Sequence, residues 1–238
     1  MVRAVLFDAG NTLIRVATPV GQVYAEAAGR AGIPADGEEL ERLFRAAFGR
    51  RRAGFVAQVS RPHTPEKERA WWRDLVDEIF REAGLREALG TSFDAFFEDV
   101  YRTFERPEVW EVFPDVFPCL DALAALGLPL GVVSNWDSRL HAVLRGLGLT
   151  ERFRFALTSA EFGAEKPHPS IFREAARRFG LPPEEVLHVG DLLRDDVEGA
   201  RAAGLQALLL DRGCEPHPDG TARICRLGEV PERVLAGG

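Results

Sequence analysis

The residue best suited to chemistry in this chain is an aspartate that directly follows a short apolar segment. The segment Ala4–Phe7 is β-prone and gives way at once to Asp8, Gly10 and Asn11, which predicts a buried strand ending in a turn. Open α/β sheets bind their ligands at the carboxyl ends of the strands, where this aspartate would lie. An aspartate at a strand end can also simply stabilise a turn, so this segment alone leaves both roles open.

Three later segments add polar side chains of complementary kinds. Residues 130–135 read Leu-Gly-Val-Val-Ser-Asn, an apolar run that ends in a hydroxyl and an amide. Residues 166–169 read Lys-Pro-His-Pro, a stiff loop that carries a cation just before an amphipathic helix. Residues 186–196 form a third apolar run followed by an acidic loop, Gly-Asp-Leu-Leu-Arg-Asp-Asp. Taken together and in this order, the four segments are a specific pattern.

In type and order the four segments resemble the motifs of the haloacid dehalogenase (HAD) superfamily, and the resemblance covers essentially the whole chain. A narrower likeness, to the branch named haloacid dehalogenase-like hydrolase domain-containing protein 3, rests on Trp71-Trp72, on the Ser-Asn-Trp-Asp segment 134–137 and on residues 157–167. The resemblance implies an α/β fold, with a Rossmann-like HAD core, a parallel sheet and an inserted α-helical cap. It also implies a hydrolase, most directly a phosphatase acting on a small phosphorylated substrate.

The resemblance assigns a role to each polar residue of the motifs. Asp8 is expected to attack the substrate and form a covalent intermediate that water then hydrolyses. Negative charge accumulates in phosphoryl transfer, so a cation and a metal ion must offset it, and Mg²⁺ prefers oxygen ligands. The expected metal ligands are Asp8, the Gly10 carbonyl, Asp191 and Asp196, with the role of Asp195 left open. The expected phosphate-binding groups are Ser134, Asn135 through its backbone N–H, and Lys166.

Each of these residues also has a purely structural alternative. The Ser134–Asn135 pair could begin a turn, and the Asp195–Asp196 pair could cap a helix beginning at Val197. Lys166 could be a surface charge. Composition weakens that last alternative, because arginine supplies nearly all the positive charge and the only lysines are Lys166 and Lys67. A compact ammonium at this one loop differs in chemistry from a forked guanidinium.

Gly10 departs from the superfamily pattern, which has a second aspartate two residues after the nucleophile. In the superfamily that aspartate gives its backbone carbonyl to the metal and transfers a proton through its side chain. Gly10 keeps the carbonyl but cannot transfer a proton, and the amide of Asn11 is no substitute. Loss of general acid–base catalysis typically costs about 10²–10⁴-fold in rate. We therefore expect slow hydrolysis of alkyl phosphomonoesters and better hydrolysis of aryl phosphates, acyl phosphates or a substrate that carries its own acid.

Two other functions stay open at this point. A 2-haloacid dehalogenase also lacks the second aspartate, since a leaving halide needs no proton. Its fourth motif, however, lacks the metal-binding Gly-Asp pair that is present here as Gly190-Asp191. A non-catalytic HAD-fold protein that binds a phosphorylated ligand or a partner protein would explain Gly10. Retention of Asp8, Lys166 and Asp191 argues against it.

The elements that position these residues follow from hydrophobic periodicity. From Val109 onward helical and strand patterns alternate, with strands expected at residues 129–134, 155–158, 186–189 and 205–210. Such alternation predicts a parallel sheet with helices on both faces. The expected division is a core of residues 1–15 and 106–238 and a helical cap of residues 16–105. The Gly- and Pro-rich tail after residue 211 gives little indication of structure.

Within the cap, helix-start signals are expected at two places. Thr64 should cap a helix that has Pro65 at its first position, and Ser92 should cap another. Residues 50–61 are expected to be irregular. The aromatic pair Trp71-Trp72 lies in a bulky stripe at helical spacing, which is more typical of a bundle core than of a substrate pocket.

Bulk composition excludes several classes of partner. The 238 residues carry a formal net charge of −7, which gives no general attraction to nucleic acid or to an anionic membrane. No apolar run approaches the roughly 18 residues that span a bilayer. The amino terminus has no signal-peptide pattern. The three cysteines show no paired metal spacing and are expected to be reduced thiols in a cytoplasmic protein. Oligomeric state is not indicated.

Overall fold

A six-stranded parallel sheet forms the centre of the protein. The computed structural model describes residues 1–55, 64–214 and 222–236. The strand order is β5-β4-β1-β6-β7-β8, and each neighbouring pair is parallel. The strands are β1 (Ala4–Phe7), β4 (Leu130–Ser134), β5 (Ala156–Thr158), β6 (Val186–Gly190), β7 (Gln206–Leu210) and β8 (Arg223–Ile224). The predicted Rossmann-like parallel sheet is confirmed.

Side chains of the central strand alternate between two buried layers. In β1, Val5 and Phe7 pack into one hydrophobic cluster, whereas Ala4 and Leu6 pack into the other. Because successive strand residues point to opposite faces, a strand covered on both faces is apolar throughout. That is why β1 reads as an unbroken apolar run.

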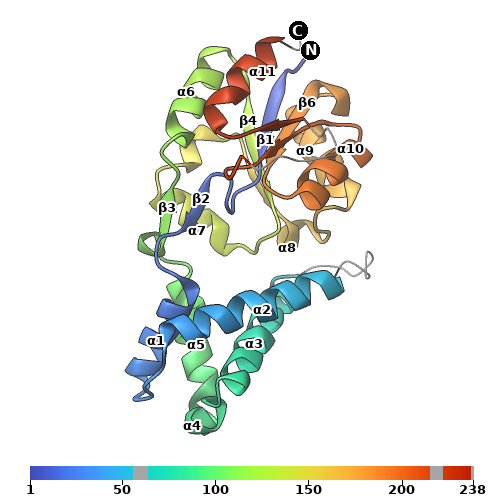
Figure 1. Cartoon of the computed structure of the whole chain (residues 1–238). Helices are drawn as coiled ribbons and strands as arrows, with labels where there is room; N and C mark the ends of the chain where they lie inside the picture. The colour runs from blue at the N-terminus through green and yellow to red at the C-terminus, as the bar shows by residue number, and fades with distance from the viewer. Residues whose placement is uncertain (56–63, 215–221, 237–238) are drawn as a thin grey trace.

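Helices cover both faces of this sheet (Figure 1). Three helices contribute residues to the cluster that contains Val5 and Phe7. They are α6 (Val116–Ala125), α7 (Arg139–Gly146) and α11 (Val230–Ala236). The opposite face packs against α9 (Pro169–Phe179), the π-helix η5 (Leu193–Glu198) and α10 (Gly199–Ala202). Short connecting elements are η2 (Pro107–Val109), η3 (Thr150–Arg152), α8 (Ser159–Phe162), η4 (Pro183–Glu185) and η6 (Leu227–Glu229).

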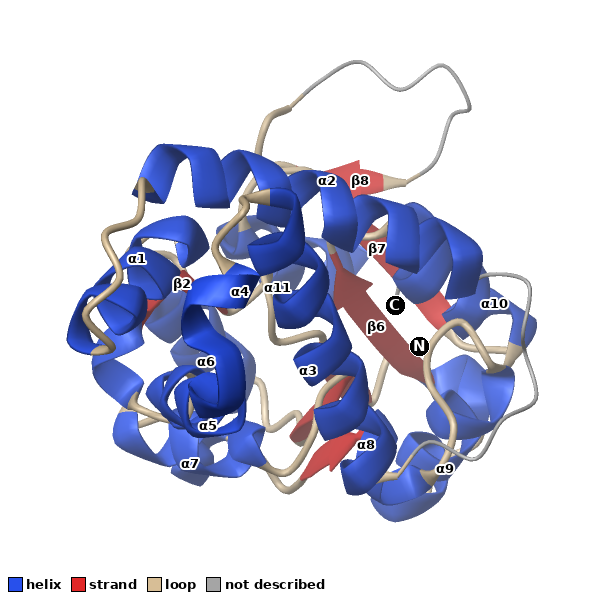
Figure 2. Ribbon diagram, turned by 90° about the horizontal axis from the view of Figure 1, so that it is seen from below, coloured by secondary structure: helices blue, strands red, loops and turns tan. Residues whose placement is uncertain are grey.

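A second group of helices lies beyond the carboxyl edge of the sheet (Figures 1 and 2). These helices are α1 (Val20–Arg30), α2 (Gly37–Phe55), α3 (Pro65–Glu82), α4 (Arg86–Leu89), η1 (Gly90–Ser92) and α5 (Phe93–Thr103). They share a hydrophobic cluster that contains no strand residue of the sheet. The chain enters and leaves this group through an antiparallel pair, β2 (Ile14–Val16) with β3 (Trp110–Val112). On this basis we propose that residues 16–105 form a cap module, as the sequence predicts.

Both predicted cap helices begin at the expected residues, Pro65 and Phe93, but only the first has the expected side-chain cap. The Thr64 hydroxyl accepts a hydrogen bond from the Lys67 N–H, with Pro65 in the first turn. Ser92 makes no such bond, because its backbone is already helical and η1 runs directly into α5. A capping residue needs an extended backbone, which Ser92 does not have.

The prediction that residues 50–61 are irregular is wrong up to Phe55, because α2 continues to that residue. Arg50 and Arg51 both form ion pairs with Glu78 on α3, which tie this part of α2 to its neighbour. The remainder of that stretch, residues 56–63, lies outside the described residues. Trp71 and Trp72 pack against the cap cluster, as the core interpretation predicts.

Cys214 and Cys225 form a disulfide, so the expectation of three reduced thiols is wrong. The two cysteines follow the parallel neighbours β7 and β8, and the Asp211 N–H donates to the Ile224 carbonyl between them. This pairing of distant segments brings the sulfur atoms together, and it removes the cysteine argument for a cytoplasmic location. Cys119 is a free, buried thiol.

The tail beyond residue 211 is more ordered than its composition suggests. Ile224, Leu227, Val230 and Val234 pack into the same cluster as β1, so β8 and α11 complete one face of the core. Among the described ranges, no helix combines the length and apolarity needed to cross a membrane.

Candidate active site

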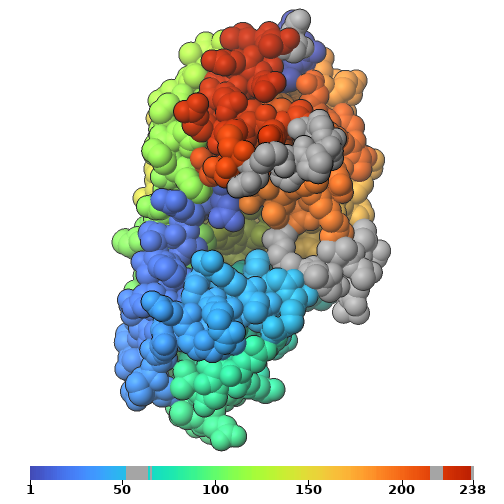
Figure 3. Space-filling model, viewed as in Figure 1, coloured from blue at the N-terminus to red at the C-terminus, as the bar shows by residue number. Residues whose placement is uncertain are grey.

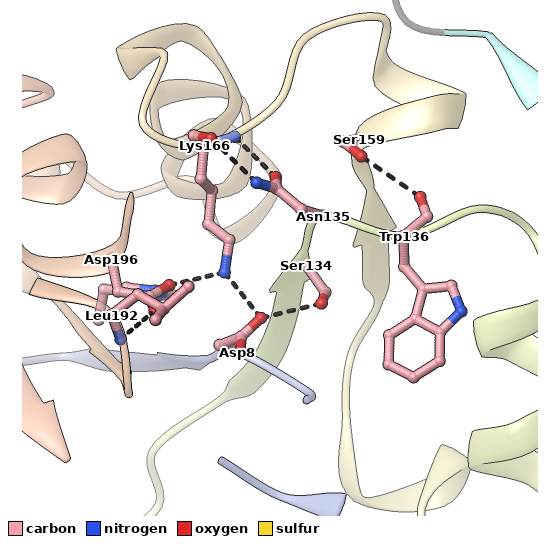
Figure 4. Close-up of polar contacts among 9 residues, drawn as sticks. Asp8, Ser134, Asn135, Trp136, Ser159, Lys166, Leu192 and Asp196 are labelled. Carbon is pink, nitrogen blue, oxygen red and sulfur yellow. Dashed lines mark hydrogen bonds and ion pairs between the residues drawn. The ribbon is translucent and has the colours of Figure 1, made fainter. Parts of the chain in front are cut away.

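The nucleophile candidate Asp8 is held by two side chains from other strands and loops (Figure 4). Its Oδ1 accepts a hydrogen bond of 2.9 Å from the Ser134 hydroxyl and one of 2.7 Å from the Lys166 ammonium. All three residues are buried. Asp8 follows β1 and Ser134 ends the adjacent β4, so the parallel pairing of these strands brings the two side chains together.

Lys166 bridges two carboxylates rather than one. Its Nζ also donates to Asp196 Oδ1 at 2.6 Å, and its side chain is only 3% exposed. Burial by itself would lower the pKa of Lys166, but the charges of Asp196 and Asp8 outweigh burial and raise it. Lys166 therefore stays cationic in the site. The resemblance requires a cation at this position, whereas the alternative of a surface charge does not require one in the site.

The side chain of Asn135 fixes the backbone of Lys166. Its Nδ2 donates to the Lys166 carbonyl at 2.9 Å, and its Oδ1 accepts from the Lys166 N–H at 2.7 Å. The sequence suggested only the backbone N–H of Asn135 as a phosphate donor. The structure gives the amide side chain a second role, which is to hold the lysine loop against the end of β4.

Asp196 lies at the centre of the buried polar network. Its Oδ1 also contacts His188 Nε2 at 2.9 Å, and its Oδ2 accepts from the Leu192 N–H at 3.0 Å. Burial opposes ionisation of Asp196, but Lys166 and His188 more than offset burial and lower its pKa. Asp196 lies inside the π-helical turn η5, which rules out the alternative that it caps a helix beginning at Val197. Such turns are frequent at functional sites.

Gly190 allows this placement, and replacing it should disrupt the site. A Cβ at position 190 would overlap the carboxyl group of Asp196. We expect Gly190→Ala to force Asp196 out of its contacts and to lower the free energy of unfolding by about 1–3 kcal/mol. Urea denaturation measures this change. Gly29→Ala is the matched control, because a Cβ there meets no atom within 4 Å. Equal stability of the two variants would contradict the expectation.

Three carboxylates form a cluster that fits a divalent metal. Asp8, Asp191 and Asp196 each offer an oxygen, and these oxygens lie within 4.8 Å of one another. Within the described ranges this is the one group of acidic, histidine or cysteine side chains with such spacing. Oxygen donors of this kind suit Mg²⁺. Gly10 lies two residues after Asp8 and retains a carbonyl for the same ion.

Charge repulsion within the cluster changes the acidity of Asp191. Burial, together with the charges of Asp8 and Asp196, raises the pKa of Asp191 to about 7. A carboxylate with a pKa this high is incompletely ionised at neutral pH unless a cation binds beside it. The acidic cluster therefore holds more negative charge than Lys166 alone neutralises, which is the electrostatic condition for metal binding.

The raised pKa of Asp191 predicts how stability depends on pH in the metal-free protein. Folding favours the protonated form, so this stabilisation is full below the ordinary pKa of 3.8 and is lost as pH rises through about 7. In chelator, we expect the wild-type melting temperature to fall across this window relative to that of Asp191→Asn. Thermal melts of both proteins at matched pH values measure the difference. Parallel pH profiles would contradict the assigned shift.

The fold and this site define a class of α/β proteins with an acidic site at the carboxyl edge of a parallel sheet, and comparison with known proteins identifies the family. The family model described as haloacid dehalogenase-like hydrolase matches residues 2–204. The chain belongs to this family.

Within the family the chain is similar to several known proteins. Haloacid dehalogenase-like hydrolase domain-containing protein 3 of Danio rerio is 36% identical over 237 residues, covering 98% of this chain and 96% of that protein. A phosphoserine phosphatase of Thermus thermophilus is 35% identical over 174 residues, covering 70% and 67%. A solved 2-haloacid dehalogenase from Pseudomonas syringae aligns over the full length of both chains, with a TM-score of 0.69 and 26% identity.

Proposed function

We propose that this chain is a Mg²⁺-dependent phosphatase that cleaves small phosphorylated molecules through an aspartyl-phosphate on Asp8. The observation that carries the proposal is the convergence of a nucleophile, a buried ammonium and an acidic cluster at one edge of the sheet. Similarity to a phosphoserine phosphatase supports the choice of phosphate chemistry.

The residues present divide the work of phosphoryl transfer. Asp8 forms a bond to phosphorus while the bond to the leaving oxygen breaks, and water later hydrolyses the aspartyl-phosphate to release phosphate. Lys166 and the Ser134 hydroxyl offset charge on the phosphoryl oxygens. Asp8, Asp191, Asp196 and the Gly10 carbonyl would hold Mg²⁺, which supplies positive charge against the developing negative charge when bound.

We infer that the cap partly encloses this site. In the space-filling view a recess lies between α2 and the core above it (Figure 3). Caps of this kind admit substrate and limit the access of water to the reaction. A small substrate suits such a recess better than a large one does.

A phosphatase assay with the nucleophile removed tests the proposal. We expect the wild-type protein with Mg²⁺ to release phosphate from members of a panel of phosphate monoesters and acyl phosphates, and Asp8→Asn to show no turnover. Chelation of the metal should abolish the activity, because the acidic cluster would then repel the phosphate. Equal phosphate release by the wild-type protein and Asp8→Asn across the whole panel would overturn it.

A 2-haloacid dehalogenase is the second candidate, favoured by Gly10 and by similarity to a solved dehalogenase. Halide leaves without a proton, so a missing acid costs such an enzyme little. The acidic cluster argues against this function, because three clustered carboxylates disfavour both a bound carboxylate substrate and a departing halide. Chloride release from 2-chloropropionate in the presence of a chelator would establish it.

A further inference from the structure

Trp136 lies beside the position where the superfamily's proton-transferring aspartate would project. A Cβ built on Gly10 meets one atom within 4 Å, the Cζ3 of Trp136 at 3.8 Å. The indole therefore faces the backbone two residues after the nucleophile. In the view of Figure 4, Lys166 and Trp136 lie on opposite sides of Ser134.

The indole is held in this place from several directions. The Trp136 carbonyl accepts hydrogen bonds from the Ala160 N–H at 3.2 Å and the Ser159 hydroxyl at 3.4 Å. The Trp136 ring packs on the Trp110 ring, with the ring centroids 4.9 Å apart. Trp110 is held in turn, because its Nε1 donates to the Phe104 carbonyl at 3.1 Å. Trp136 is only partly buried and packs against the core cluster that contains Phe7.

The same loop is also tied to the cap. Asp137, the next residue, is buried and receives hydrogen bonds from the Tyr101 hydroxyl at 2.6 Å and from Arg139. These contacts fix the backbone on the far side of Trp136. A ring that packs on Trp110, on a backbone fixed at its own carbonyl and at Asp137, loses little conformational freedom when a ligand packs on it.

The position of the ring points to the chemistry of the leaving group. A general acid must reach the oxygen that leaves, so the side chain at position 10 is adjacent to the leaving group in enzymes that have one. In this chain, position 10 carries no acid, and it lies next to the aromatic ring of Trp136. Aromatic surfaces prefer flat, apolar partners, with a gain beyond simple burial of area. A phenol-type oxygen also leaves without a proton far more readily than an alkyl oxygen does.

We propose that Trp136 determines specificity by packing against the leaving group, and that the substrates are small aryl phosphate monoesters. In the reaction the Asp8 oxygen bonds to phosphorus, and the bond from phosphorus to the aryl oxygen breaks. The electron pair leaves on the aryloxide, which takes a proton from water. A second water then attacks phosphorus, releasing inorganic phosphate and the Asp8 carboxylate. This inference rests on the proposed phosphatase function.

Binding to a protein that cannot turn over tests the inference separately from the activity. Calorimetry on Asp8→Asn with Mg²⁺ compares phenyl phosphate with cyclohexyl phosphate, a ligand of similar size and charge without an aromatic ring. We expect phenyl phosphate to bind about 2- to 10-fold more tightly. Adding Trp136→Ala should bring the ratio to about one, and adding Trp136→Phe should retain most of the preference.

Inorganic phosphate, which has no leaving group, is the control ligand for all three proteins. Unchanged phosphate binding shows that each Trp136 variant is folded and keeps its anion site. If phosphate binds but the phenyl preference is absent, or survives Trp136→Ala, the inference fails while the phosphatase proposal stands. If neither phosphate nor any phosphate ester binds in the presence of Mg²⁺, the proposed function fails, and the inference fails with it.

Discussion

Gly10→Asp should increase the hydrolysis of an alkyl phosphate by roughly 10²–10⁴-fold, the usual contribution of general acid–base catalysis. The backbone at Gly10 does not require glycine, since it is absent from the residues with positive φ. A Cβ there is in ordinary van der Waals contact with Trp136 and with nothing nearer. The backbone at position 10 therefore accepts a side chain without strain at its Cβ. Steady-state kinetics on glycerol phosphate with Mg²⁺ measure the change in kcat.

Gly10→Asn is the matched control, because it adds nearly the same volume but transfers no proton. We expect no gain from it. Phenyl phosphate should gain less from Gly10→Asp than glycerol phosphate does, since its leaving group needs little protonation. An equal gain in kcat for Gly10→Asp and Gly10→Asn would assign the effect to packing. No gain in kcat for either variant would show that Gly10 does not limit the reaction.

The sequence predicts which polar residues lie together, because their positions follow from strand ends. A parallel sheet brings the carboxyl ends of its strands to one edge, so Asp8, Ser134 and Asp191 had to converge once the strands were recognised. The apolar runs marked those strands clearly, since both faces are buried. Lys166 lies in a loop before α9 rather than at a strand end, and its role was implied by the family resemblance.

Contacts that depend on tertiary placement could not be predicted in the same way. A polar His188 in the otherwise apolar strand β6 signals a buried polar contact, but the sequence does not show that its partner is Asp196. Gly190 gave no sign that a side chain there would displace Asp196. The disulfide depends on β7 and β8 lying side by side, and β8 itself is too short for its two residues to show a periodicity.

Replacement of Lys166 should have the largest effect on stability, because it leaves two buried carboxylates without their shared cation. The Lys166 Nζ lies 2.7 Å from Asp8 and 2.6 Å from Asp196, and Asp196 is fully buried. Removing one partner of a buried ion pair typically costs about 3–5 kcal/mol. We expect Lys166→Met to lower the free energy of unfolding by about this amount at pH 7 and to abolish phosphatase activity. Urea denaturation without metal measures the loss.

The pH dependence of this loss distinguishes electrostatics from simple misfitting of methionine. Lys166 helps to lower the pKa of Asp196, so its stabilisation through Asp196 is present above the ordinary pKa of 3.8 and is lost as pH falls below it. The stability difference between wild type and Lys166→Met should therefore shrink in acid, and Mg²⁺ should partly restore the variant at pH 7 by replacing the missing charge. Lys67→Met, at the other lysine and on the exposed surface of α3, is the matched control and should change stability little. A loss that is the same at every pH, or that Lys67→Met reproduces, would show that Lys166 does not act by neutralising Asp8 and Asp196.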